Sequence, residues 1–186
     1  STIAHAGYLM VGLAAVASRT PDADAIIGPS GVLFYLSGYA ITNLAAFSAV
    51  IAISNRINSD LIDSFAGMAR RAPFLAGVLG FSMISLIGVP PTVGFMSKIY
   101  IFGAAVDTNL EWLAVTGMVN SVISAYYYLR VVKVMYLREP IDDAPVGSAL
   151  PMKLAVIVTM AGTAFFGIYP TPLINLARSA VDVLVS

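Results

Sequence analysis

The amino-acid sequence predicts an all-α integral membrane protein, built as a bundle of transmembrane helices. Hydrophobic residues make up 59% of the 186 residues even before the 15 glycines are counted, and charged residues make up 11%. Soluble domains contain about 45–50% apolar and about 25% charged residues. The charges separate long runs that are apolar on every face, whereas the strands of a membrane barrel alternate apolar and polar residues. Composition and pattern therefore favour helices that cross a lipid bilayer.

The first two apolar segments have the length and the boundaries of membrane-spanning helices. Residues 2–18 contain no Lys, Arg, Asp or Glu, and they end at a loop, residues 19–30, that contains proline and glycine. Residues 31–54 form the second segment and precede a polar loop, residues 55–73, with three arginines. A helix of about 24 residues is long enough to cross about 30 Å of hydrocarbon.

The third apolar segment, residues 74–107, is longer than one ordinary span and is interrupted at residues 88–91. A transmembrane helix needs about 20 residues. Pro90 and Pro91 lack a backbone N–H, and their rings clash with the preceding helical turn. The segment is therefore expected to be one broken helix.

The surroundings of this break also predict unusual hydrogen bonding. Gly88 and Gly94 loosen the backbone on either side of the two prolines. The prolines leave the carbonyls of Leu86 and Ile87 without helical partners, and in a membrane such carbonyls must find partners within the protein or in water. We therefore expect the break to lie against protein or water and not against lipid.

The rest of the chain contains two further spans and a tail. Residues 112–137 form the fourth span, and a loop at residues 138–151 contains prolines and acidic residues. Residues 152–169 form the fifth span. Residues 171–186 begin with Thr-Pro and are expected to form an amphipathic C-terminal tail.

The distribution of Lys and Arg indicates that the broken segment crosses the membrane once. One crossing places seven basic residues on one side of the membrane and two on the other, whereas two crossings divide them five against four. The seven are Arg56, Arg70, Arg71, Arg130, Lys133, Arg138 and Lys153, and the two are Arg19 and Arg178. Cytoplasmic loops of membrane proteins carry an excess of Lys and Arg, so the side with seven is expected to be cytoplasmic.

Lys98 is the only charged residue deep inside a predicted span, and it lies one turn beyond Gly94. An ammonium at the bilayer centre costs about 2.5–3.5 kcal/mol on translocon scales, so such a residue is functional or paired. Because a buried lysine can release and regain a proton, Lys98 is the candidate proton carrier. Helix breaks beside ionisable residues are typical of transporter ion sites. The alternative is a structural lysine, paired or extended to the membrane surface.

Polar residues on two other spans fall on one helical face each. The second span contributes Tyr35, Tyr39, Thr42 and Asn43, and the fourth contributes Gly117, Asn120, Ser121, Ser124 and Tyr128. Tyr39, Asn43 and Ser124 are the candidates for a proton pathway, because such faces can hold water. The alternative is helix packing, in which small and hydroxyl residues hydrogen-bond between helices.

Two further ionisable residues are candidates for the same pathway. His5 lies near the start of the first span and could pass protons, although a buried neutral histidine bonded to a neighbour is an equal alternative. Lys133 lies at the basic end of the fourth span. Its alternative is anchoring at the membrane surface, together with Arg130.

Several kinds of site are excluded within this chain by its composition. The sequence contains no Cys, so it cannot form a disulfide, an iron–sulfur cluster or a zinc–thiolate site. Its one histidine is too few for a haem pair, and no nucleotide-binding glycine motif is present. Ten basic and ten acidic residues give no positive field for nucleic acid. No cofactor or metal site is therefore expected.

Three segments resemble the antiporter-like membrane subunits of respiratory complex I, the proton-pumping NADH:quinone oxidoreductase. STIAHAGYLMVG resembles the family segment A-Y-S-S-I-x-H-x-G-Y, and SLIGVPPTVGFMSKIYIF resembles its broken helix, S-L-x-G-x-P-P-x-x-G-F-x-x-K. NSVISAYYYLRVVKVMYLREP is similar to N-S-x-x-S-x-Y-Y-Y-L-R-V in the branch called subunit N. Subunits L and M lack that Tyr-rich ending. The resemblance covers nearly the whole chain.

The resemblance implies a protein of fourteen helices in two inverted repeats, of which this chain would hold most of the second. Lys98 falls on the lysine of the broken helix, which the family uses in its proton pathway. NAD, FMN, iron–sulfur clusters and quinone would be bound by other subunits. The implied partners are the other membrane subunits, especially the neighbouring antiporter-like subunit, and lipid. The implied location is the bacterial plasma membrane.

Two other interpretations fit the same residues. A subunit of a multi-subunit Na⁺/H⁺ antiporter shares the Pro-Pro and Lys motif of the broken helix. A membrane scaffold would use Lys98 only as a structural partner. Because the chain begins at Ser1 within an apolar segment, we expect it to be a fragment of a longer chain.

Overall fold

A computed structural model describes residues 1–18, 27–140, 142, 144, 146–147 and 150–185, and within these ranges all regular structure is helical. The predicted loop at residues 19–30, with Arg19, lies mostly outside the described residues. The helices are α1 (Thr2–Ala17), α2 (Ile27–Ile57), the 3₁₀ helix η1 (Ile62–Phe65), α3 (Met68–Arg71), α4 (Pro73–Ile87), α5 (Val93–Asp107), α6 (Glu111–Leu137), α7 (Leu150–Ile168) and α8 (Thr171–Val185).

Helix α2 is longer than the predicted segment at residues 31–54. It begins at Ile27 because Pro29 lies in the first turn, where a missing backbone N–H leaves no helical hydrogen bond unmade. It continues to Ile57 because Arg56, in the last turn, complements the negative end of the helix dipole. The helix therefore continues beyond both ends of the predicted apolar segment.

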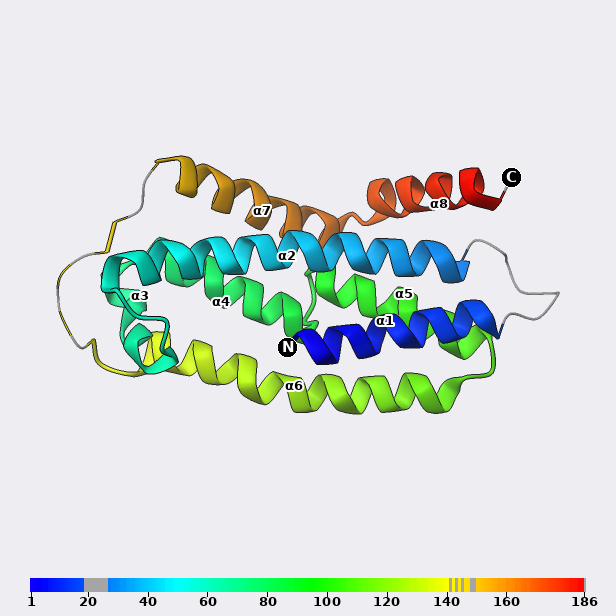
Figure 1. Ribbon diagram of the computed structural model, residues 1–186, viewed down its shortest axis with the longest axis horizontal. Coiled ribbons are helices and arrows are strands. Elements are labelled where there is room, and N and C mark those ends of the chain that lie inside the picture. Colours follow the sequence, from blue (N-terminus) through cyan, green and yellow to red (C-terminus); the bar gives the residue numbers. More distant parts are fainter. Residues whose placement is uncertain (19–26, 141, 143, 145, 148–149, 186) are drawn as a thin grey trace.

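Helices α4 and α5 follow one another along the long axis of the bundle, in the same direction (Figure 1). They are separated by residues 88–92, which are not helical. The broken segment therefore traverses the bundle once, while α2 and α6 each run along most of its length (Figure 1). Each half has 15 residues, or about 22 Å at 1.5 Å per residue, so neither half alone matches the thickness of a bilayer.

Helix α2 is the centre of the packing and contacts α1, α4, α5, α7 and α8. Its buried face carries small side chains, including Ala45, Ala49 and Ala52, which let neighbouring backbones approach closely, as in membrane helix pairs. Helix α6, in contrast, carries large side chains that are exposed, namely Val119, Val122, Ile123 and Tyr126. That face of α6 lies on the outside of the described bundle.

Among the described residues, one helix is long and apolar enough by itself to cross a membrane, namely α2 over Gly28–Ile57. The pair α7 and α8 meets the same requirement only together, with a bend of 86° between them. Helix α6 has 27 residues, but Asn120, Ser121 and Ser124 lower its hydropathy. The number of membrane crossings therefore depends on helices that are short, broken or partly polar.

The predicted single crossing of the broken segment places the two ends of the bundle on opposite sides of the membrane. Leu61 lies at the end formed by η1 and α3, and Glu111 begins α6 at the other end (Figure 1). In the intact membrane, a cysteine at Leu61 should react with an impermeant maleimide only from the cytoplasmic side, and one at Glu111 only from outside. Reaction of both from the same side would contradict the single-crossing topology.

Candidate functional site

The break between α4 and α5 has a defined backbone geometry. Helix α4 ends at Ile87 and is capped by Gly88, whose φ of +89° lies in the left-handed region that glycine adopts without strain. The peptide bond between Pro90 and Pro91 is cis. Helix α5 begins after Thr92, whose side-chain oxygen accepts a hydrogen bond from the Phe95 backbone N–H. Each half-helix is therefore capped separately.

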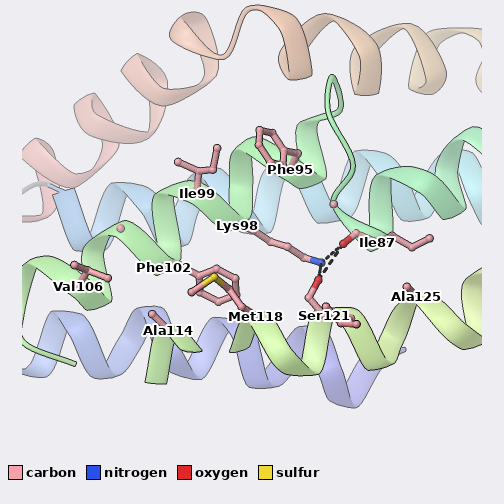
Figure 2. Close-up of a pocket in the computed structure, with 13 residues that line it drawn as sticks. Ile87, Phe95, Lys98, Ile99, Phe102, Val106, Ala114, Met118, Ser121 and Ala125 are labelled. Carbon is pink, nitrogen blue, oxygen red and sulfur yellow. Dashed lines mark hydrogen bonds between the residues drawn. The ribbon is translucent and has the colours of Figure 1, made fainter. Parts of the chain in front are cut away.

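Lys98 supplies the partners that the freed carbonyls of α4 require. Its Nζ donates to the carbonyl oxygen of Ile87 at 2.6 Å and to the Ser121 hydroxyl at 2.7 Å (Figure 2). It also donates to the carbonyl oxygen of Leu86 at 3.1 Å. These three bonds use all three hydrogens of the ammonium. The residue is 6% exposed. The side chain thus turns back toward the break and does not extend to an end of the bundle.

The partners of Lys98 are neutral oxygens. The ion pairs within the described residues are Arg71 with Asp142 and Arg138 with Asp63, and neither includes Lys98. The C-terminal end of α4 carries the negative end of its helix dipole, which favours a cation. Because no carboxylate pairs with Lys98, its neutral form leaves no uncompensated anion in the interior.

Ser121 joins the three helices of the site. Its hydroxyl accepts from Lys98 of α5 and donates to the Ile87 carbonyl at 3.0 Å, at the end of α4. One turn further along α6, the buried Ser124 donates to the Ser121 carbonyl at 2.7 Å. The break, the lysine and the middle of α6 are therefore one hydrogen-bonded unit.

Beside this unit lies an apolar groove of about 620 Å³ between α5 and α6 (Figure 2). Its walls include Phe95, Ile99, Phe102 and Met118, and its polar side chains are Lys98 and Ser121. Several wall residues, among them Ile99, are exposed on the surface of the chain. The groove therefore leads from the exterior of the bundle to the buried ammonium.

On the other side of Lys98, His5 is the centre of a buried aromatic cluster. Its Nδ1 lies 2.6 Å from the Tyr35 hydroxyl and its Nε2 lies 3.0 Å from the Tyr128 hydroxyl. A neutral imidazole donates at one nitrogen and accepts at the other, so His5 links the two tyrosines in one chain of hydrogen bonds. The ring stacks on Tyr39 with 4.5 Å between centroids.

The histidine cluster and the lysine site meet in two places. Tyr8 lies edge-on to His5, and its ring centroid is 4.9 Å from Lys98 Nζ, a cation–π contact. A second cavity, of about 10 Å³, is lined by both His5 and Lys98, and by Tyr39 among others. That volume is about the smallest that holds one water molecule. His5 and Lys98 therefore line one cavity of a size that holds a single water molecule.

The structure gathers most, but not all, of the predicted pathway residues. Lys98 and Ser124 belong to the hydrogen-bonded unit at the break, and His5 and Tyr39 line the small cavity that Lys98 also lines. Asn43 is half-buried one turn beyond Tyr39 and lines neither cavity. Lys133 is exposed, and twelve residues separate it from Ser121 on α6, or about 18 Å along the helix.

Tyr8 is the contact residue that the sequence interpretation missed. Its spacing of three residues from His5 places both side chains on one face of α1. That spacing could have predicted a contact between Tyr8 and the site of His5. It did not stand out, because apolar residues fill most of the other positions of α1.

Comparison with known proteins places the chain in a family. Residues 1–124 match the family model described as NADH:quinone oxidoreductase/Mrp antiporter, transmembrane. The chain is 43% identical over 185 residues to NADH-quinone oxidoreductase subunit N of Dehalococcoides mccartyi, covering 100% of this chain and 38% of that protein. It is 42% identical to subunit N of Heliobacterium modesticaldum, covering 99% and 37%. The chain therefore spans less than two fifths of the length of these relatives.

Solved structures share the fold. A chain of the Mrp complex from Dietzia superposes with a TM-score of 0.81 and 22% identity, over 95% of this chain and 40% of that one. A chain of respiratory complex I from Thermus thermophilus superposes with a TM-score of 0.66 and 23% identity, over 92% and 43%.

These matches confirm both the predicted all-α membrane fold and the resemblance drawn from the three motifs. The curated relatives are bacterial and the family is transmembrane, as expected for an integral protein of the bacterial plasma membrane. Because the family model covers well over half of the chain, the chain belongs to the NADH:quinone oxidoreductase/Mrp antiporter transmembrane family.

Proposed function

We propose that this chain is part of a proton-translocating membrane subunit of an NADH:quinone oxidoreductase, and that Lys98 carries the proton. The observation that carries this proposal is the bonding of Lys98, a buried ammonium held by two carbonyls and one hydroxyl. A buried cation with neutral partners can lose its proton without leaving an unpaired charge behind. The similarity to subunit N of several bacteria supports the assignment.

The bonding also suggests how proton loss would affect the break. A neutral amine has two hydrogens, so it can hold at most two of its three present acceptors. Release of the proton toward the small cavity and His5 would therefore free one of the oxygens of Leu86, Ile87 or Ser121. The number of hydrogen bonds between α5 and the end of α4 would then depend on the protonation of Lys98.

The remaining pathway residues lie at different distances from Lys98. Ser124 is hydrogen-bonded to Ser121, the partner of Lys98, and His5 and Tyr39 line the small cavity beside Lys98. Asn43 and Lys133 would extend the proton path toward the basic end of the bundle. Their position along α2 and α6 supports their place in this path.

The electron-transfer steps are proposed to lie in other subunits, which would bind NAD, FMN, iron–sulfur clusters and quinone. The partners of this chain would be other membrane subunits, especially a neighbouring antiporter-like subunit, and lipid. The curated relatives are named as subunits of NADH-quinone oxidoreductase, which agrees with this division of labour.

A second candidate function is a subunit of a multi-subunit Na⁺/H⁺ antiporter. The superposition on the Mrp complex, with a TM-score of 0.81, favours it, but the identity of 22% supports the fold alone. The sequence identity of about 40% to subunit N favours the first proposal.

Purification of the native complex separates the two proposals. We expect the tagged chain to copurify with NADH-binding and quinone-binding subunits, and reconstituted vesicles to pump protons when NADH and a quinone are added. Copurification with antiporter subunits, and proton exchange that depends on Na⁺ and not on NADH, would support the second candidate and contradict the first.

A further inference from the structure

The C-terminal end of α6, which is expected to be cytoplasmic, carries a basic depression that does not include Lys98. The depression has a volume of about 340 Å³. Its residues are Tyr126, Leu129, Arg130, Lys133, Val134 and Arg138. Three of these six side chains are cationic and none is acidic. Such a surface attracts an anion.

Two of the three cations have no acidic partner in the described part of the chain. Arg138 pairs with Asp63 at 2.6 Å, but Arg130 and Lys133 take part in neither of the ion pairs found there. Both are exposed. They lie three residues apart on α6, a spacing that places two side chains on neighbouring positions of one helix face. One phosphate group can therefore contact both.

An apolar strip joins this depression to the groove beside Lys98. Val122, Tyr126 and Leu129 are 75%, 77% and 50% exposed, and they precede Lys133 at spacings of four, three and four residues, which keeps all four on one face. Val122 lines the groove and Tyr126 lines the depression. The two concave regions thus belong to one continuous face of α6.

The distance along this face matches half of a bilayer. Eleven residues separate Val122 from Lys133, which corresponds to about 16 Å along a helix. One leaflet contributes about half of the 30 Å hydrocarbon thickness. A lipid whose phosphate lies at Lys133 would therefore place the end of its acyl chain in the groove beside Lys98.

We propose that α6 binds an anionic phospholipid of the cytoplasmic leaflet, with its phosphate between Arg130 and Lys133 and one acyl chain along the strip into the groove. The two unpaired cations select an anionic head group over a zwitterionic one. The exposed apolar side chains of the strip contact the acyl chain. The chain closes the groove on the lipid side of Lys98, so that water reaches the ammonium from the side of His5.

Photo-crosslinking in vesicles tests this site. The complex that contains the full chain is reconstituted in phosphatidylcholine with a small fraction of phosphatidylglycerol that carries a diazirine at the end of one acyl chain. We expect the label on this chain to map to the groove walls, within residues 95–106 and 114–125. In the double variant R130Q/K133Q the labelling should fall about 30-fold, the change expected for two basic residues at an anionic surface.

The control is the double variant R56Q/R70Q, which removes two exposed basic residues at the same end of the bundle but outside the depression. It should retain the labelling of the parent. Equal loss in both double variants, equal labelling by a diazirine phosphatidylcholine, or displacement by inorganic phosphate would each overturn the proposal. Crosslinking of the strip to a neighbouring subunit instead of lipid would also overturn it. The labelling does not measure proton pumping, so its outcome is independent of the role of Lys98.

Discussion

Replacing Lys98 with alanine is expected to lower NADH-driven proton pumping by at least about tenfold, because removal of a positioned proton-transfer group commonly costs about 10²-fold or more in rate. The quinone-linked oxidation of NADH should fall as well where the two processes are tightly coupled. Pumping by the purified variant complex in proteoliposomes, normalised to the amount of this subunit, is the measurement.

The structure adds a second consequence of the same substitution. Lys98→Ala removes the donor that bonds the Leu86 and Ile87 carbonyls, although Ser121 still donates to Ile87. A buried carbonyl left without a partner costs about 1–3 kcal/mol. The variant should therefore assemble, but with a lower melting temperature than the parent complex.

Two companion variants separate the proton role from the structural one. Lys98→Arg keeps a cation at the break, but a guanidinium does not release its proton, so pumping should remain low while assembly is retained. Ser121→Ala removes one acceptor of Lys98 and leaves the amine in place, so it should reduce pumping less than either Lys98 variant. Parent-level pumping by both Lys98→Ala and Lys98→Arg would show that Lys98 is only structural.

Replacing Gly94 with alanine is expected to cause the largest structural loss. A Cβ at Gly94 would overlap the carbonyl oxygen of Ser85, across the contact between α4 and α5. Overpacking typically costs about 1–3 kcal/mol and occasionally more. Here the obstructing atom belongs to a helical backbone, which cannot turn aside as a flexible side chain does. The amount of subunit in the assembled complex, measured by immunoblot of native gels, should fall severely.

Gly103→Ala is the matched control, because it lies on the same helix and a Cβ there meets nothing within 4 Å. Alanine also has a higher helix propensity than glycine, so this variant should assemble at the parent level. Normal assembly of Gly94→Ala would mean that α4 and α5 can separate at the break without loss of the fold.

The class of fold and the position of the break follow from the amino-acid sequence alone. Long apolar runs bounded by charges predict membrane helices because lipid leaves backbone groups no other partners. Pro90 and Pro91 interrupt a helix in any surroundings, since they lack the N–H that the helix requires. Lys98 was conspicuous for the same local reason, because it is a charge within an apolar run. The end of α2 was predicted less well, because helices continue past the last apolar residue when a polar turn is compatible with their ends.

Which side chains and carbonyls meet depends on how the helices pack. The freed carbonyls of Leu86 and Ile87 were expected to need partners, but only the arrangement of α5 after the break brings the Lys98 side chain back to them as the donor. Likewise, the link from His5 to Tyr128 joins residues 123 positions apart. Helical periodicity predicts which face of one helix is polar, but it carries no information about the rotation and depth at which two helices pack. Those depend on close packing between helices, as where Gly94 lies against the Ser85 carbonyl, and therefore on the whole bundle.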